Sequence, residues 1–224
     1  MITAMSGTRA EVFGLGRFQR GGELVDFEIG WPEFARDVAW ARRMLAAWRV
    51  AAGDHVVLTT PNWEGPWASP LIHALRELGT VHSNAEPYTW DARRTSTFLR
   101  WLPVRAIIGM SEEAAVALVA DASNVALLAK VPLLWARPEA LGVLRDAGVR
   151  PAGFAKLGPA LGLECPEKSG LHLDPAEWRV GPGLTLSTVG ERAYRAVEVP
   201  LGVDGHLDQS PCACGLPGAR VRLD

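Results

Sequence analysis

Segments that read as buried strands alternate with segments of helical periodicity from residue 31 to residue 148, and this alternation limits the folds open to the chain. The predicted strands cover Asp54–Thr60, Thr80–Ser83, Arg105–Gly109 and Val131–Trp135. The predicted helices run from Trp31 to the turn at Gly53, and over Pro70–Leu78, Asp91–Leu102, Glu112–Asp121 and Pro138–Ala147. Such alternation predicts an α/β fold, built on a parallel sheet with helices on both faces.

The pattern changes after Gly148, where Pro, Gly and short β-like runs replace helical periodicity. Residues 154–162 are predicted to form a loop-rich junction. Short strands are predicted over His172–Leu173, Trp178–Val180, Leu184–Ser187, Ala196–Val199 and Arg220–Leu223. We therefore expect two units, an α/β domain over residues 1–153 and a small C-terminal β-rich lobe over residues 154–224.

All three cysteines of the chain fall in the predicted lobe, together with a nearby histidine. Cys165 and His172 are close in sequence, and Cys212 and Cys214 form a C-x-C-G turn further along. Three thiolates and one imidazole are a common ligand set of closed, tetrahedral zinc sites. The sequence therefore predicts a structural zinc ion that stabilises a lobe with little core of its own.

Three other interpretations of these residues stay open. The cysteines can be small buried apolar residues, with the histidine unrelated to them. His206 can take the place of His172 as a ligand. The C-x-C pair can be redox-active, although no nearby group in the sequence supplies the positive charge that lowers a thiol pKa.

The charges of the chain are nearly balanced, with 23 Lys and Arg against 25 Asp and Glu and no basic block. This argues against nucleic acid as a partner. No apolar run approaches the ~20 residues of a membrane span, and the N-terminal residues lack the pattern of a secretory signal. We therefore expect a cytoplasmic protein without a membrane partner, and a reducing compartment favours metal binding over disulfides.

Polar and aromatic side chains follow the first two predicted strands of the sheet, where ligands of such sheets usually bind. The candidate substrate-binding residues are Trp63, Trp67, Asn84, Tyr88 and Trp90, and Glu64 lies in the same segment. His82 is the candidate general base, and Glu86 is its candidate orienting partner. Because the chain has nine tryptophans, ordinary packing is the competing interpretation of the aromatic residues.

Several segments resemble a known family, the phenylacetate–coenzyme A ligases. GLECPEKSGLHLDPAEW, LTLSTVGERAYRAVEV and PCACGLP are similar to the C-terminal region of the large domain of these enzymes, and GDHVVL, ELGTV and RAIIGMSEEAAVAL to the stretch after its ATP loop. The family belongs to the adenylate-forming, AMP-binding superfamily of acyl-CoA synthetases. The resemblance covers residues 31–224 and implies a zinc ion on Cys165, His172, Cys212 and Cys214.

The chain departs from that family where the family binds ATP. GLGRFQRGGELVDFEIGW stands in place of the Ser/Thr/Gly-rich phosphate loop, and PAGFAKLGPALGLEC lacks the motif with the magnesium-binding Glu. VEVPLG lacks the Asp that holds the AMP ribose, and the mobile C-terminal domain with the catalytic Lys has no counterpart before Asp224. Because adenylyl transfer depends on these groups, the resemblance implies a degenerate homologue with no ATP cofactor.

The sequence therefore predicts a non-adenylating homologue that binds an acyl or aryl small molecule, or an acyl thioester, without ATP, as a pseudoenzyme or partner subunit. One alternative is an ATP-independent biosynthetic enzyme of secondary metabolism that cyclises, isomerises or transfers an acyl or aromatic intermediate. Another is a fragment that completes a partner ligase chain. Both a homo-oligomer and a separate partner protein are open.

Overall fold

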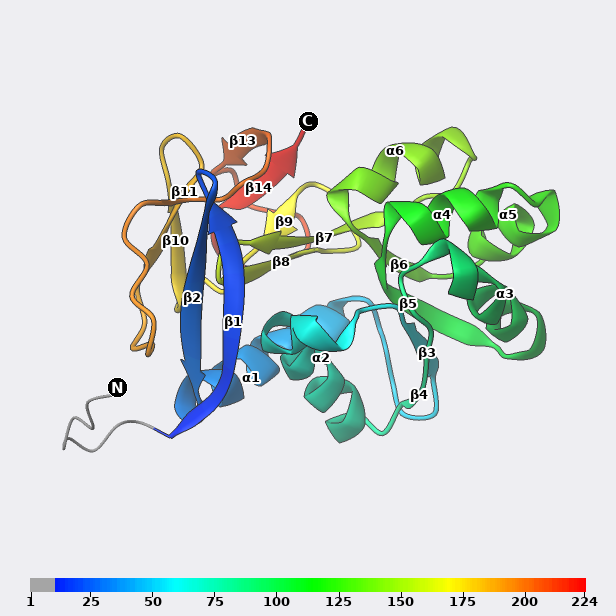
Figure 1. Cartoon of the computed structure of the whole chain (residues 1–224), viewed down its shortest axis with the longest axis horizontal. Coiled ribbons are helices and arrows are strands. Elements are labelled where there is room, and N and C mark those ends of the chain that lie inside the picture. The colour runs from blue at the N-terminus through cyan, green and yellow to red at the C-terminus, as the bar shows by residue number, and fades with distance from the viewer. Residues whose placement is uncertain (1–10) are drawn as a thin grey trace.

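The computed structural model describes residues 11–224. It begins with an antiparallel hairpin of two long strands, β1 (Val12–Arg20) and β2 (Glu23–Gly30), which stands at one end of the molecule (Figure 1). The turn uses Gly21 and Gly22, which have φ of 55° and 91° and so occupy a region that glycine reaches at little cost. The segment that the sequence analysis compared with a phosphate loop is therefore a β-hairpin, which we did not predict.

Two helices, α1 (Trp31–Ala47) and α2 (Gly65–Glu77), pack with the strands of the main sheet into one apolar cluster. The backbone N–H of Gly30 donates to the Glu33 carboxylate at 2.8 Å at the start of α1, and the buried stripe of α1 includes Phe34, Met44 and Leu45. β3 (His55–Leu58) follows α1, the short helix η1 (Asn62–Glu64) precedes α2, and β4 (Val81–Asn84) follows it. These elements lie where the sequence predicts them, except that α2 begins at Gly65 and not at the predicted Pro70, because Pro66 suits the first turn of a helix.

Four helices on the opposite face pack into a second apolar cluster. They are α3 (Ala92–Trp101), α4 (Glu112–Val119), α5 (Ala122–Leu128) and α6 (Pro138–Asp146), connected through η2 (Thr89–Asp91), β5 (Val104–Met110) and β6 (Leu133–Ala136). The helix predicted over Glu112–Asp121 extends too far, because α4 ends at Val119. The Asp121 side chain accepts a hydrogen bond from the Ser123 N–H at 2.8 Å and so caps α5, a helix that we did not predict.

The main sheet has nine strands in the order β13-β14-β9-β8-β7-β6-β5-β3-β4. The strands that complete it are β7 (Ala152–Leu157), β8 (Ala160–Glu164), β9 (Leu171–His172), β13 (Gly205–Asp208) and β14 (Arg220–Leu223). Pairing is parallel from β4 to β7 and antiparallel from β7 to β13. The parallel sheet predicted for the α/β unit is therefore present from β4 to β7, whereas β8, β9, β13 and β14, which fall in the predicted C-terminal lobe, extend the same sheet with antiparallel pairing.

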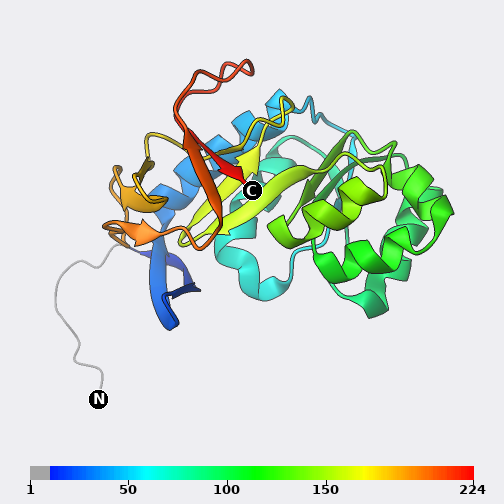
Figure 2. The ribbon, with the colours of Figure 1, turned by 90° about the horizontal axis from the view of Figure 1, so that it is seen from above.

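The predicted loop-rich junction over residues 154–162 was also wrong, because this segment forms the β7–β8 hairpin. Gly158, with φ of 59°, and Pro159 make only the turn. The flanking strands are rich in Ala and Gly, which lack the β-branched and aromatic side chains that mark a strand in sequence. This hairpin lies between β6 and β9 in the sheet, and seen from above it lies between the green helices and the orange strands (Figure 2).

A separate three-stranded antiparallel sheet contains β10 (Trp178–Gly181), β11 (Thr185–Thr188) and β12 (Val199–Pro200). The apolar cluster that holds α1 and α2 continues into this sheet and the β1–β2 hairpin. The predicted domain boundary after residue 153 falls inside β7, and the division into two domains stays a prediction. No helix within residues 11–224 combines the length and apolar character that a membrane span requires.

Candidate functional site

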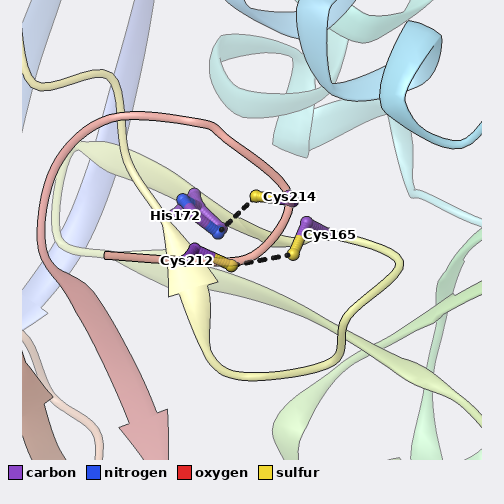
Figure 3. Close-up of side chains that lie close together, drawn as sticks. All are labelled: Cys165, His172, Cys212 and Cys214. Carbon is purple, nitrogen blue, oxygen red and sulfur yellow. Dashed lines mark hydrogen bonds between the residues drawn. The ribbon is translucent and has the colours of Figure 1, made fainter. Parts of the chain in front are cut away.

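Cys165, His172, Cys212 and Cys214 converge on one point (Figure 3). Their ligand atoms all lie within 4.8 Å of one another. The sulfurs of Cys165 and Cys212 are 3.7 Å apart, and the Cys214 sulfur is 3.6 Å from Nε2 of His172. The four residues that the sequence analysis selected can therefore hold a metal ion.

Strand pairing brings these four residues together. Cys165 directly follows β8 and His172 ends β9, which pairs with β8. Cys212 and Cys214 lie in the loop between β13 and β14, and β14 pairs with the other edge of β9. His206, the alternative ligand, is exposed on β13 with Nδ1 3.7 Å from a carboxylate oxygen of Asp224, so the structure favours His172.

Cys165, His172 and Cys212 are buried, and Cys214 is half-buried. Burial raises the pKa of the Cys165 thiol to about 12, and burial, together with nearby Arg220, lowers the pKa of His172 to about 4. Burial opposes ionisation of Cys212 as well, but its contact with the Ser169 hydroxyl at 3.2 Å helps to lower the pKa of Cys212 to about 7. The imidazole is therefore neutral at neutral pH, which is the form that binds metals.

A second candidate site lies at the carboxyl ends of the parallel strands. We call it the aromatic groove, a hollow of about 770 Å³. Its aromatic lining residues are Phe27 of β2, Trp63 of η1, Trp67 of α2 and Tyr194 of the loop after β11. Its charged lining residues are Glu64 and Lys156, together with Arg17, Asp26 and Glu28 of the hairpin. Aromatic walls with a few charged groups are typical of small-molecule sites.

Glu64, Arg137 and Lys156 form a charged cluster that extends from the groove. The Glu64 carboxylate accepts two hydrogen bonds from Arg137, at 2.8 and 2.6 Å, and one from Lys156 at 2.5 Å. Burial raises the pKa of Glu64, but the hydrogen bonds and charges of Arg137 and Lys156 outweigh it and hold the pKa below its usual value. The Lys156 ammonium also lies 5.2 Å from the centre of the Trp67 ring, so it is fixed between a carboxylate and an aromatic face.

The predicted pocket residues separate into two groups. Trp63 and Trp67 line the aromatic groove, whereas His82, Asn84 and Glu86 do not. Burial is the main cause of a lowered pKa of His82 on β4, with repulsion from Arg76 and His55 adding to it. Within residues 11–224 no hydrogen bond joins His82 to Glu86, whose backbone N–H instead donates to Asp91 at 2.7 Å. The catalytic roles proposed for His82 and Glu86 stay predictions.

Trp63, Tyr88 and Trp90 meet at the surface, and we call them the exposed aromatic cluster. The Tyr88 ring lies 6.3 Å from the Trp63 ring and 5.8 Å from the Trp90 ring, between centroids. Trp63 is 67% exposed and Trp90 is 68% exposed. Trp67 points elsewhere, since its indole N–H donates to the Gly158 carbonyl at 3.0 Å.

Sequence reasoning missed Arg137 and Lys156 as members of a site. Arg137 directly follows β6, and Lys156 lies near the end of β7. The sequence analysis sought candidate residues only after the first two predicted strands. A search after every predicted strand would have included Arg137. It would not have reached Lys156, because β7 was not recognised as a strand.

Solved structures that share this fold include 2-hydroxyisobutyryl-CoA ligase and MenE. 2-Hydroxyisobutyryl-CoA ligase, in an open conformation in complex with 2-HIB-AMP and CoA, matches with a TM-score of 0.69 and 13% identity over 94% of this chain and 56% of that chain. The same enzyme in the thioesterification state gives 0.67 and 14% identity, over 94% of this chain and 51% of that chain. Escherichia coli MenE with a bound analogue of OSB-AMS gives 0.55 and 9% identity, over 92% of this chain and 47% of that chain.

Because the sequence identities are only 9% to 14%, these matches show a similarity of fold alone. The chain has the fold seen in adenylate-forming acyl-CoA ligases, and it spans about half the length of those structures. No protein-family model and no curated protein matches the sequence.

Proposed function

We propose that this chain binds an acyl or aryl small molecule, or an acyl thioester, in the aromatic groove, as a non-adenylating relative of the phenylacetate–CoA ligases. The observation that carries the proposal is the set of four aromatic side chains that line one groove together with Lys156 at the carboxyl ends of the strands. Aromatic walls with a few charged groups suit a ligand with an apolar body and a polar end. The likeness to ligases of acyl groups supports the same ligand class.

Three features support binding without ATP. The hairpin turn in place of a phosphate loop, Arg20 to Glu23, has no hydroxyl side chain. The segment compared with the family's magnesium-binding motif, Lys156 to Ala160 around the β7–β8 turn, carries no carboxylate. Val197–Gly202 lacks the family's ribose-binding Asp. Catalysis of adenylyl transfer needs such groups to position and neutralise the phosphates.

The test has two parts. A panel of aryl and alkyl carboxylic acids and their thioesters is titrated by calorimetry and ligand-observed NMR, and ATP–pyrophosphate exchange is measured with each acid. We expect saturable binding of some members and no exchange. Trp63→Ala should weaken binding about tenfold, whereas Trp101→Ala, which removes another exposed tryptophan, should not. Exchange above background would overturn the proposal of binding without ATP. Equal affinities of the two variants would show that the ligand does not bind in the groove.

We also propose that the ion held by the cysteine and histidine cluster is structural zinc. A tetrahedral zinc ion with Zn–S of about 2.3 Å and Zn–N of about 2.0 Å separates two sulfurs by about 3.8 Å, and sulfur from nitrogen by about 3.5 Å. The sulfurs of Cys165 and Cys212 are 3.7 Å apart, the Cys214 sulfur is 3.6 Å from Nε2 of His172, and all four ligand atoms lie within 4.8 Å of one another. All four coordination positions would be filled by Cys165, His172, Cys212 and Cys214, which supports a structural role because no position is left for a substrate.

Metal analysis of the purified protein tests this assignment. We expect close to one zinc per chain, lost in Cys212→Ser, Cys214→Ser and His172→Ala, with a lower melting temperature in each variant. His206→Ala is the matched control and should keep the metal. A metal-free wild-type protein that melts at the same temperature with and without added zinc would contradict the proposal.

The exposed aromatic cluster favours a second candidate function, that of a subunit which docks a partner through Trp63, Tyr88 and Trp90. Aromatic side chains at this exposure are enriched in interfaces. Native mass spectrometry of the protein purified from its own cells should then detect a homo-oligomer or a heterocomplex that Trp90→Ser dissociates. A monomer at cellular concentration would rule this candidate out.

A further inference from the structure

A pocket of about 140 Å³ lies between the last turn of α6, the loop from Cys165 to Gly170, and β14. Three cations line it, one from each of these elements: Arg145, Lys168 and Arg222. We call it the basic pocket, and it shares no lining residue with the aromatic groove. Its volume equals that of several water molecules at ~30 Å³ each, which is enough for a phosphate group.

The single carboxylate in the lining does not neutralise these cations. Glu164 is buried, and its two oxygens accept hydrogen bonds from the backbone N–H groups of Gly153 at 2.7 Å and Gly170 at 2.9 Å. One negative charge therefore stands against three positive charges in the lining.

Carboxylates outside the lining do not cancel the net positive charge of the pocket. Asp208 pairs with Arg222 at 2.8 Å, but the same oxygen also pairs with Arg220 at 2.8 Å, so one carboxylate serves two guanidinium groups. Within residues 11–224, Arg145 has no carboxylate oxygen within 4.0 Å. Asp146 and Glu167, the acidic sequence neighbours of Arg145 and Lys168, do not line the pocket.

Two contacts hold the Lys168 side chain in place. Its ammonium donates to the Arg150 carbonyl at 2.5 Å and lies 5.9 Å from the centre of the Trp48 ring. An anion that enters the pocket therefore meets an ammonium whose position is already fixed.

We propose that the basic pocket binds a phosphate group, with Arg145, Lys168 and Arg222 as its donors. A phosphate group offers several acceptor oxygens to donors that arrive from different directions, and guanidinium groups can bind two of those oxygens at once. The site is independent of ligand binding in the aromatic groove. The phosphate group can come from free inorganic phosphate or from a phosphate ester, since both present the same oxygens.

Titration of the full chain, with its metal as purified, tests the proposal. Inorganic phosphate and glycerol 3-phosphate are titrated by calorimetry and two-dimensional NMR at constant ionic strength. We expect saturable binding that weakens as chloride is raised. Tighter binding of glycerol 3-phosphate than of inorganic phosphate would identify phosphate esters as the ligands of the pocket. Tighter binding of inorganic phosphate would identify the free anion. Equal affinities would show that the pocket recognises the phosphate group alone.

The double variant Arg145→Gln/Lys168→Gln should bind roughly tenfold more weakly for each lost cation. The control Arg179→Gln/Lys130→Gln removes one exposed arginine and one exposed lysine elsewhere and should keep the wild-type affinity within about twofold. Circular dichroism checks that both variants fold, and the single variant Arg145→Gln replaces the double variant if it does not. Absence of saturable binding to the wild type, or equal affinities of test and control variants, would overturn the proposal.

Discussion

At the scale of single residues, Glu64 is the most constrained polar group beside the aromatic groove. Its side chain is 3% exposed, and it is held by Arg137 and Lys156. A buried carboxylate is costly unless it is paired, and removal of one partner from such a cluster leaves uncompensated charge. Glu64 therefore links the stability of the strand ends to the shape of the groove.

We predict that Glu64→Gln lowers the free energy of unfolding by about 3 kcal/mol, because Arg137 loses its carboxylate partner in a buried setting. The matched control is Asp121→Asn, whose ion pair with Arg100 is exposed and should matter little. Urea denaturation followed by tryptophan fluorescence measures both. Equal effects of the two substitutions would contradict the assigned role of Glu64.

The same residue predicts a pH dependence. The pKa of Glu64 is lower in the folded chain than its ordinary value of 4.5, so the unfolded chain binds more protons as the pH falls. The stabilisation is therefore complete above about pH 5 and is lost as the pH falls below about 4.5. The difference in stability between wild type and Glu64→Gln should narrow over this acidic range, and a constant difference would count against the ion pair.

At the scale of elements, the β1–β2 hairpin forms one wall of the aromatic groove through Phe27. The Phe27 ring packs against Trp67 with centroids 5.1 Å apart and against Tyr194 at 6.1 Å. Gly16 lies opposite Phe27 in the pairing of the two strands. A Cβ atom at residue 16 would lie 2.3 Å from two atoms of the Phe27 ring, so glycine at this position leaves room for the ring.

We predict that Gly16→Ala displaces the Phe27 ring, lowers the stability by about 1–3 kcal/mol and weakens ligand binding in the groove. Gly14→Ala is the matched control on the same strand, because a Cβ there meets no atom of the described residues within 4 Å. Thermal denaturation and the ligand titrations check the pair. Two variants of equal stability would show that the ring adapts without cost.

At the scale of the whole molecule, an ion-pair network joins α1 to the three-stranded sheet. Arg192 donates to Asp37 of α1 at 2.7 Å and to Glu177 at 2.8 Å, and Arg36 of α1 donates to Glu177 at 2.6 Å. The Arg192 side chain is 4% exposed, and its guanidinium carbon lies 4.5 Å from the centre of the Trp178 ring. The network connects residues of the predicted α/β unit with residues of the predicted lobe.

We predict that Arg192→Met destabilises the chain by about 3 kcal/mol, since it leaves the carboxylates of Asp37 and Glu177 without a shared partner. Hydrogen exchange should speed up in α1 and in β10 together. Arg195→Met, three residues away and exposed, is the control and should change stability by less than about 0.5 kcal/mol. Faster exchange confined to residues 177–200 would mean that the network does not couple the two parts.

Local information was enough for much of the helical part and for the choice of candidate metal ligands. The apolar stripe of α1, with Phe34, Met44 and Leu45, is visible in the sequence because helical contacts repeat at short spacing. The cluster of Cys165, His172, Cys212 and Cys214 was predictable because few residue types bind metals, the chain has three cysteines, and His172 is close to Cys165 in sequence.

Only the tertiary structure decided the antiparallel half of the sheet and the composition of the groove. Strands β7 and β8 carry few residues of high β-propensity, so their pairing depends on burial among neighbours that a local window does not include. Glu64 meets Arg137 and Lys156 across 73 and 92 positions of sequence, and Trp67 turns toward Gly158 across 91 positions. The sequence determined which residue types stand at the strand ends, but the order of the strands in the sheet set which of them meet, because that order depends on packing over the whole chain.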